Sequence, residues 1–148
     1  TLSLLEHQLQ KAGIEIKADL EPDLPVVHGN TGKLQQVFLN LFLNARDAMS
    51  GGGRLEVRTW SDGSGARAEV ADTGHGIAPE NLHRIYDPFF TTKAARKGTG
   101  LGLSITYGII QEHGGSIEVS NRRGGGARFR IELPLAVPRP ARKPVTAA

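Results

Sequence analysis

The stretch from residue 34 to residue 49 constrains the fold most, because it must form a helix that packs against a core. Asn40, Asn44 and Asp47 share one side of this helix, next to an apolar stripe. The stripe has the three- and four-residue spacing of an amphipathic helix and consists of Leu34, Val37, Phe38, Leu41, Ala45 and Ala48. Asparagine is a poor helix former, so two asparagines inside a helix indicate either a functional site or a solvated polar edge. This stretch alone leaves both interpretations open.

The segments on either side alternate between helical and strand patterns. A helix is predicted over residues 2–12, ended by Gly13, and Thr31 is predicted to cap the central helix. A short helix is predicted over residues 79–85, and a longer one begins at Leu101. Alternating apolar residues predict strands that begin near Ile14, Leu55, Ala66, Ile117 and Ala127. This order predicts an α/β two-layer sandwich, in which a mixed, mostly antiparallel sheet of about five strands packs on about three helices.

Length, composition and charge exclude several classes of protein. With 148 residues, 39% of them apolar, the chain has room for one compact domain, expected at residues 1–137 and followed by a Pro-rich basic tail or linker at residues 138–148. No apolar run is long enough to span a bilayer and there are no cysteines, so we expect no disulfides, no thiolate metal sites and no direct membrane contact. The expected location is the cytoplasm, either as a cytoplasmic protein or as the cytoplasmic part of a membrane-bound one. The net charge of +3 comes from the tail, which contains three of the 18 basic residues and no acidic one. The rest of the chain therefore has 15 basic and 15 acidic residues. A neutral body provides no basic groove, so no nucleic acid partner is expected.

The segment Asp72-Thr-Gly-His-Gly-Ile follows directly on a strand pattern. A carboxylate at the end of a buried strand can accept a hydrogen bond from the exocyclic amine of adenine, whereas guanine carries a carbonyl at that position. Gly74 and Gly76 leave the backbone bare, so that a flat base can approach it. The competing interpretation is an ordinary β-turn, which also favours aspartate first and glycine later.

The segment Gly98-Thr-Gly-Leu-Gly-Leu opens the helix near the C-terminal end. Glycines before a helix expose backbone N–H groups at the positive end of its dipole, which suits a triphosphate, although a flexible hinge explains glycines equally well. The spacing fits neither the dinucleotide fingerprint nor a Walker loop. The irregular span of residues 91–98 contains Lys93, Arg96 and Lys97 and little that is apolar. We expect it to form a mobile lid whose cations reach phosphates, while ordinary solvation accounts for each cation taken singly.

Taken in order, these motifs resemble the ATP-binding catalytic domain of sensor histidine kinases. The resemblance covers about residues 1–135 and rests on Asn40-Leu-Phe-Leu-Asn-Ala, Asp72-Thr-Gly-His-Gly-Ile and Gly98-Thr-Gly-Leu-Gly-Leu-Ser. That family shares the Bergerat ATP-binding fold with DNA gyrase, the MutL repair proteins and the ninety-kilodalton heat-shock chaperones. Phe89-Phe-Thr-Thr-Lys and Asn44-Ala-Arg-Asp-Ala-Met are most similar to the nitrogen-regulation type of sensor kinase.

The resemblance implies a role for each matching residue. Asn44 matches the asparagine whose amide oxygen is a Mg²⁺ ligand, Asn40 matches its partner near the phosphates, and Asp72 matches the carboxylate that reads adenine. Asn40, Asn44 and Lys93 are the implied catalytic residues. The other implied nucleotide contacts are Asp47, Gly74, Gly76, Ile77, Phe90, Thr92, Lys93, Gly98, Thr99, Gly100, Leu101, Gly102 and Leu103. The ATPase branches of the fold carry a water-activating glutamate at the position of Asn40, and an amide lacks that basicity, so slow hydrolysis is expected.

The resemblance also implies how such a domain would be used. It would bind Mg-ATP and transfer the γ-phosphoryl group to a histidine on a separate dimerisation domain, with a response regulator downstream, and the isolated domain would be monomeric. None of the five histidines in this chain has the sequence context of the phosphoacceptor. Two alternatives stay open: a serine-directed or mitochondrial-type protein kinase of the same fold, and a non-catalytic binding module in which ATP only orders the lid.

Overall fold

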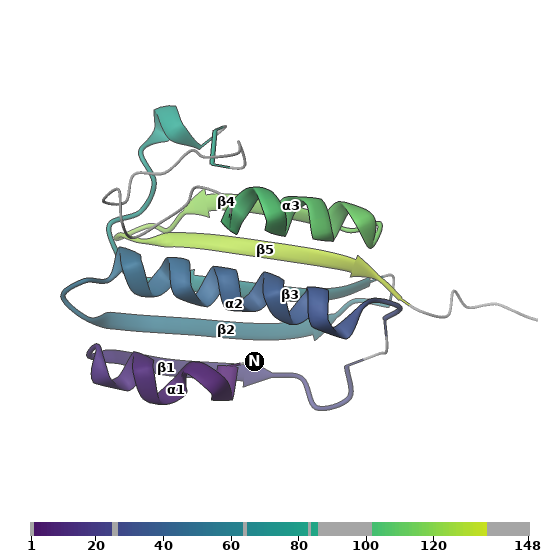
Figure 1. The fold of residues 1–148 in the computed structure, drawn as a ribbon, viewed down its shortest axis with the longest axis horizontal. Coiled ribbons are helices and arrows are strands. Elements are labelled where there is room, and N and C mark those ends of the chain that lie inside the picture. The colour runs from purple at the N-terminus through teal and green to yellow at the C-terminus, as the bar shows by residue number, and fades with distance from the viewer. Residues whose placement is uncertain (1, 25–26, 64, 83, 86–101, 136–148) are drawn as a thin grey trace, which may run out of the picture.

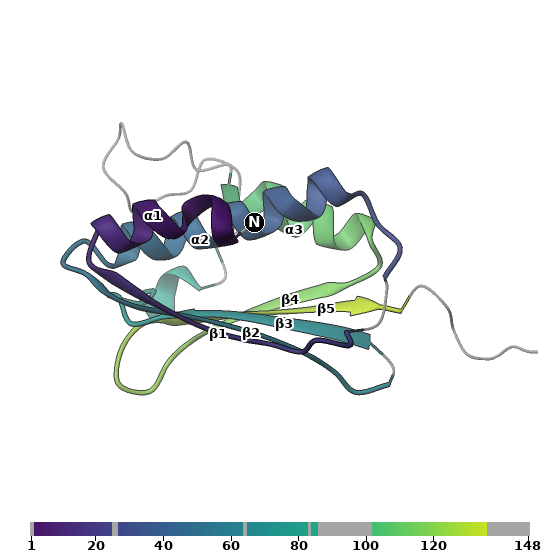
Figure 2. The same ribbon diagram turned by 90° about the horizontal axis from the view of Figure 1, so that it is seen from below.

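The computed structural model describes residues 2–24, 27–63, 65–82, 84–85 and 102–135, which fold into two layers (Figure 1). The three α-helices of this part of the chain lie together on one face of a five-stranded sheet, and none of them covers the other face (Figure 2). In chain order the elements are α1 (Leu2–Lys11), β1 (Ile14–Leu20), α2 (Thr31–Ala48), β2 (Gly53–Ser61), β3 (Gly65–Asp72), a 3₁₀ helix (Pro79–Asn81), α3 (Gly102–Glu112), β4 (Ser116–Asn121) and β5 (Ala127–Pro134). The predicted α/β two-layer sandwich is confirmed.

The sheet has the strand order β1-β2-β3-β5-β4. Strand β1 runs parallel to β2, and the chain crosses between them through α2, because neighbouring parallel strands cannot be joined by a tight turn. The other three pairings are antiparallel, and short turns join β2 to β3 and β4 to β5. Strand β3 therefore lies in the middle of the sheet, and its last residue, Asp72, is buried.

Helix α2 supplies much of the core through its buried residues Val37, Leu41, Phe42 and Ala45. Phe42 lies outside the apolar stripe that the sequence predicted. It is buried because α2 lies between the two other helices and also contacts β3, so more than one side of it is covered. The rings of Phe38 and Phe42 contact each other with centroids 6.2 Å apart.

Two expected details of the helices are wrong. Asn30, not Thr31, caps α2, since the Asn30 side chain accepts a hydrogen bond from the Lys33 backbone N–H at 2.9 Å and Thr31 is already helical. The short helix expected over residues 79–85 is a 3₁₀ helix at Pro79–Asn81. Proline fits its first turn, but a single 3₁₀ turn has poorer hydrogen-bond geometry than an α-helix and such segments stay short.

His113, which follows the last residue of α3, ties that helix to the start of α2. Its Nδ1 lies 2.7 Å from the Ile109 carbonyl oxygen and its Nε2 lies 3.0 Å from the Asn30 backbone nitrogen. Because a backbone N–H can only donate, Nε2 is the acceptor and Nδ1 carries the hydrogen. Beside it, the Lys33 ammonium group hydrogen-bonds Glu112 at 2.8 Å and lowers the pKa of that carboxyl group.

The open face of the sheet carries charges of both signs in alternation. Across three neighbouring strands, Arg58, Glu69 and Arg130 lie side by side, with an Arg130–Glu69 ion pair at 2.8 Å. The Arg58 guanidinium also lies 4.5 Å from the ring centroid of Trp60. Asp19 on β1 and Glu118 on β4 continue this row beside Arg58 and Arg130, so acidic and basic residues alternate and the described part of this row forms no continuous basic stretch.

The described helices include none with the length and apolar character needed to cross a membrane. The predicted mobile lid at residues 91–98 and the predicted tail at residues 138–148 lie outside the described residues.

Candidate functional site

Asp72, at the end of β3, is the most deeply buried carboxylate that the structure describes, with 2% of its surface exposed. Its Oδ1 accepts hydrogen bonds from the backbone N–H groups of Gly74 at 2.8 Å and Ala127 at 3.3 Å. Both of its side-chain hydrogen bonds within the described chain end on Oδ1. Oδ2 therefore remains an acceptor for a donor that comes from outside these residues.

Burial raises the pKa of Asp72, because removal from water disfavours the carboxylate form. The two backbone hydrogen bonds to Oδ1 and the nearby His75 and Arg122 act in the opposite direction without cancelling it. Arg122 does not pair with this carboxylate; its guanidinium donates to the backbone carbonyl of Asp72 at 3.0 Å. A ligand that donates a hydrogen bond to Oδ2 would therefore stabilise a charge that the protein satisfies only in part.

The segment from Asp72 to Ile77, here named the Asp72 loop, is held against α2. The His75 N–H donates to the carbonyl oxygen of Ala48, the last residue of α2, at 3.2 Å. A Cβ at Gly74 would overlap that same carbonyl oxygen, so only glycine allows this approach. Gly76 has φ +75°, a backbone conformation that favours glycine. Packing and backbone conformation thus explain both glycines, and their contact with a base stays a prediction.

Asn40 belongs to α2, and its side chain reaches the start of α3. Its Nδ2 donates to the carbonyl oxygen of Gly102 at 3.1 Å and to the hydroxyl of the fully buried Thr106 at 3.2 Å. Its Oδ1 accepts a hydrogen bond from the side chain of Gln36 at 3.1 Å. Both ends of the Asn40 amide are therefore used, and they fix the start of α3 relative to α2.

Asn44 lies one helical turn beyond Asn40, on the same side of α2. It is partly exposed, and its amide makes no hydrogen bond with any other residue that the structure describes. Asp47, another turn further along, is mostly buried and lies 3.4 Å from the Arg46 guanidinium. The amide oxygen of Asn44 is thus a hard oxygen donor available to a ligand or a metal ion.

The structure places only part of the predicted phosphate side. Gly102 and Leu103 are the first two residues of α3, and both are partly buried. Seven predicted site residues lie outside the described part of the chain: Phe90, Thr92, Lys93, Gly98, Thr99, Gly100 and Leu101. Within the described residues, no cluster of three or more histidine, aspartate or glutamate side chains could hold a metal ion.

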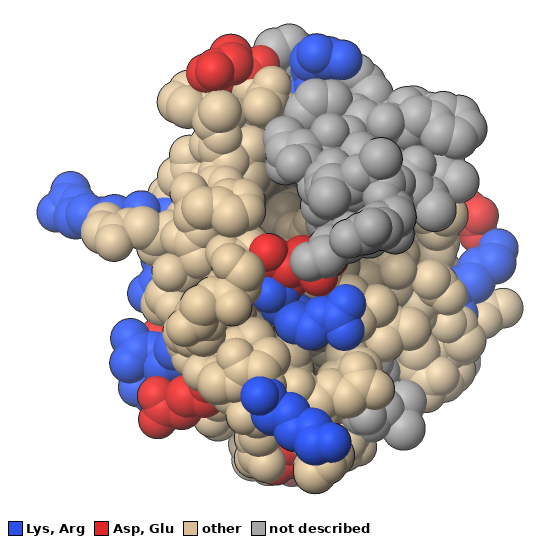
Figure 3. Space-filling view, turned by 60° about the vertical axis from the view of Figure 1, so that its left-hand side comes forward, with Lys and Arg blue, Asp and Glu red and all other residues tan. Residues whose placement is uncertain are grey.

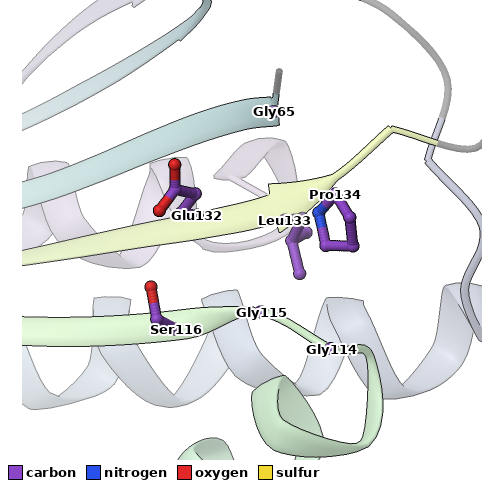
Figure 4. Close-up of a pocket in the computed structure, with 7 residues that line it drawn as sticks. All are labelled: Gly65, Gly114, Gly115, Ser116, Glu132, Leu133 and Pro134. Carbon is purple, nitrogen blue, oxygen red and sulfur yellow. The ribbon is translucent and has the colours of Figure 1, made fainter. Parts of the chain in front are cut away.

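The end of the molecule that contains the end of β3 and of α2 is shown in Figure 3, where acidic and basic side chains meet beside a hollow in the surface. A pocket lies at the C-terminal end of β5, around Glu132–Pro134, and is drawn in Figure 4. Glu132 is the one ionisable side chain among its lining residues, and it pairs with Arg67 at 2.6 Å. The Glu132 side chain is 41% exposed and paired with an arginine, whereas the Asp72 carboxylate is buried.

The structure also reveals contacts that the motifs did not predict. Asn121, Arg122, Thr106 and Gln36 each hydrogen-bond a predicted site residue. Except for Gln36, which precedes Asn40 by four residues on the same helix, they come from distant parts of the sequence. A local pattern carries no signal for such long-range contacts.

Comparison with known proteins decides the family. A family model described as histidine kinase-, DNA gyrase B-, and HSP90-like ATPase matches residues 29–137. The chain belongs to this ATPase family. Sensor histidine kinase ZraS of Escherichia coli O157:H7 is 38% identical over 144 residues, which cover 93% of the chain and 31% of ZraS. The chain thus spans about a third of the length of that relative.

Solved structures of family members agree with the fold. The catalytic domain of histidine kinase ThkA, in a nucleotide-free form, superposes with a TM-score of 0.82 at 35% identity and covers 91% of this chain and 89% of the ThkA chain. ThkA has also been solved in complex with the response regulator TrrA, with a TM-score of 0.78, 31% identity and coverage of 91% and 38%. Full-length ShkA in complex with AMPPNP superposes with a TM-score of 0.79 at 34% identity, covering 90% of this chain and 28% of ShkA.

Proposed function

We propose that this chain is the catalytic and ATP-binding domain of a sensor histidine kinase. It binds Mg-ATP and presents the γ-phosphoryl group to a histidine on a separate dimerisation domain. The observation that carries the proposal is the buried carboxylate of Asp72, whose Oδ1 is held by two backbone N–H groups while Oδ2 keeps its acceptor capacity. The exocyclic amine of adenine is the donor that fits this acceptor, and a guanine carbonyl would be repelled by it.

The chemistry of Asn44 supports a magnesium site. Its amide oxygen has no hydrogen-bond partner in the described chain, and the acidic clusters that would form a protein cage for a metal are absent from that part. Mg²⁺ commonly takes one or two protein oxygens and keeps phosphate oxygens and waters as its other ligands, so this sparse donor set fits it. When bound, the ion would neutralise charge on the transferring phosphoryl group.

The proposed role of Asn40 is to position α3, and it has no role as a base. The structure gives its amide three hydrogen-bond partners, and an amide has no basicity with which to activate water. The domain would therefore hold ATP with slow loss to hydrolysis, so that the phosphoryl group remains available for the acceptor histidine. The proposed contacts of Asp47, Gly74, Gly76, Ile77, Gly102 and Leu103, and those of the site residues outside the described chain, complete the nucleotide site.

The proposed partners follow from the same assignment. The phosphoacceptor is a histidine-bearing dimerisation domain of the same protein, and a response regulator receives the phosphoryl group afterwards. The complex of ThkA with a response regulator supports the second step. The resemblance of residues 44–49 and 89–93 to the nitrogen-regulation type supports that subtype. We propose a cytoplasmic, monomeric state for the isolated domain.

A phosphotransfer assay tests the proposal. The chain is incubated with ATP labelled on the γ-phosphoryl group and with a separately produced helical hairpin that carries the phosphoacceptor histidine. We expect label on the hairpin that is lost in acid and kept in base, and none on a hairpin whose histidine is replaced. Acid-stable label would identify a hydroxyl-directed kinase instead, and tight ATP binding without any transfer would identify a binding module.

A further inference from the structure

Asn121, the last residue of β4, makes an unusual contact with the end of the Asp72 loop. Its Oδ1 accepts the backbone N–H of Ile77 at 2.8 Å, and its Nδ2 donates to the backbone carbonyl oxygen of Ile77 at 2.6 Å. One side-chain amide therefore satisfies both backbone groups of a residue that lies 44 positions earlier in the sequence. Such a pair resembles the exchange of two hydrogen bonds between strands, but a single side chain makes it.

The contact supplies the hydrogen bonds of Ile77 within the described residues, while the Ile77 side chain packs against the core. Asp72 Oδ1 binds the N–H of Gly74, and Ala48 of α2 binds the N–H of His75, so the first half of the loop is already fixed. A Cβ at Gly76 would lie 3.0 Å from Asn121 Oδ1, which shows how closely the Asn121 amide approaches the second half.

The turn that follows Asn121 contacts Asp72 itself. Arg122 is largely buried, with 18% of its side chain exposed, and donates to the backbone carbonyl of Asp72 at 3.0 Å. Ala127, the first residue of β5, supplies the second N–H to Asp72 Oδ1. The end of β4, the turn and the start of β5 therefore contact both ends of the Asp72 loop, although the sequence motif of that loop contains none of these residues.

We propose that Asn121 is a positioning residue for adenine recognition: it holds the backbone of Gly76 and Ile77 where the base must lie beside Asp72. This inference rests on the proposed ATP-binding function. Asn121 does not react and does not contact the phosphates. It sets the geometry of the base side of the site, and the loop is prepared before nucleotide arrives, which lowers the entropy cost of binding.

A purely structural role for Asn121 predicts a different outcome. Asn121 is exposed, so its truncation leaves no cavity in the core and the fold should persist. If the contact served only stability, the folded protein would bind nucleotide as before and only the melting temperature would fall. If the contact positions the loop, affinity for the base falls even in fully folded protein.

The test compares three variants of the 148-residue chain by calorimetry with ADP in magnesium buffer, well below their melting temperatures. Asn121→Ala removes both hydrogen bonds to Ile77. Asn121→Asp keeps the acceptor but places a carboxylate oxygen against the Ile77 carbonyl. Ser120→Ala is the matched control, because Ser120 is the exposed neighbour of Asn121 on β4. It lies opposite Arg128 on the adjacent strand β5, and successive residues of a strand point to opposite faces of the sheet. We expect about tenfold weaker ADP binding for both Asn121 variants and unchanged binding for the control. Asn121→Ala loses both hydrogen bonds to Ile77, and Asn121→Asp loses one of them and sets two oxygens against each other.

A kinetic measurement separates positioning from general damage. With the histidine-bearing hairpin as acceptor, Asn121→Ala should raise KM for ATP about tenfold and leave kcat unchanged, because the base side contributes to ground state and transition state alike. Unchanged ADP affinity in Asn121→Ala, with wild-type protein that binds ADP, would overturn the proposal and leave the proposed function intact. A fall of about tenfold in kcat in Asn121→Ala would also overturn the proposal. So would a loss of ADP binding that is fully explained by the fraction of unfolded protein in the sample. Wild-type protein that binds no ADP would instead refute the proposed function.

Discussion

Replacing Asp72 by asparagine separates ligand recognition from stability. In Asp72→Asn, the side-chain oxygen can still accept the N–H groups of Gly74 and Ala127, so the Asp72 loop keeps both of these hydrogen bonds. The change is confined to the position of Oδ2, where an NH₂ group replaces an acceptor. A ligand amine that donates to Oδ2 in the wild type would face this NH₂ group in the variant. Both are donors, so the amine and the NH₂ group would each lack an acceptor.

The expected loss of affinity follows from the kind of hydrogen bond that is removed. A hydrogen bond to a charged group contributes about 1.5–3 kcal/mol, which corresponds to a loss of about tenfold to about a hundredfold in affinity. Stability should change in the opposite direction. Because burial raises the pKa of Asp72, the folded state binds more protons than the unfolded state at pH values between the ordinary and the raised pKa. The free energy of unfolding therefore falls as pH rises through that range, and asparagine avoids this loss.

Two measurements on the same samples test this reasoning. Calorimetry gives the dissociation constant for ADP, and thermal unfolding at pH 7 gives the melting temperature without ligand. We expect weaker binding for Asp72→Asn with an equal or higher melting temperature, and neither change for Asp19→Asn, an exposed carboxylate on β1. An affinity within about twofold of wild type would show that no ligand amine donates to Oδ2, and a melting temperature lower by several degrees would show that the carboxylate itself stabilises the fold.

Four further outcomes are expected. Gly74→Ala should lower the free energy of unfolding by about 1–3 kcal/mol in urea titrations, because its Cβ overlaps the Ala48 carbonyl oxygen; an unchanged midpoint would contradict that packing. Asn44→Ala should abolish the magnesium dependence of ADP affinity while the fold persists, as titrations with and without EDTA will show; a retained dependence would exclude Asn44 as the ligand. His113→Ala should cost about 1–2 kcal/mol of stability by removing the contacts to Ile109 and Asn30, with ADP affinity unchanged. In wild-type protein, ADP affinity should fall with decreasing pH around the raised pKa of Asp72, where protonation removes the acceptor, and a pH-independent affinity would argue against that carboxylate.

Local patterns were enough to predict the architecture. The helical spacing around Leu41 and the alternation around Leu55 and Val70 lead directly to α2, β2 and β3, because burial on one face imposes these periods. The same patterns predicted Asp72 at the end of a strand, where the structure has it. Its role in reading adenine remains a prediction.

Details that depend on neighbours in space were beyond the sequence. Asn30 and Thr31 are both good cap residues, and only the observed backbone shows that Asn30 accepts the hydrogen bond. Phe42 is buried because helices lie on both sides of α2, which no single helix reveals. Asn121 contacts the Asp72 loop from β4, which is an edge strand of the sheet and contains none of the predicted motifs. These contacts come from tertiary packing, which overrides local preference.

Calorimetric titration of the wild-type chain with ATP and with GTP, in the same magnesium buffer, measures whether Asp72 selects adenine. We expect binding of ATP and about a hundredfold or more weaker binding of GTP, because the carbonyl of guanine would face Oδ2 of Asp72. Equal affinities for the two nucleotides, or no heat with either, would contradict this expectation.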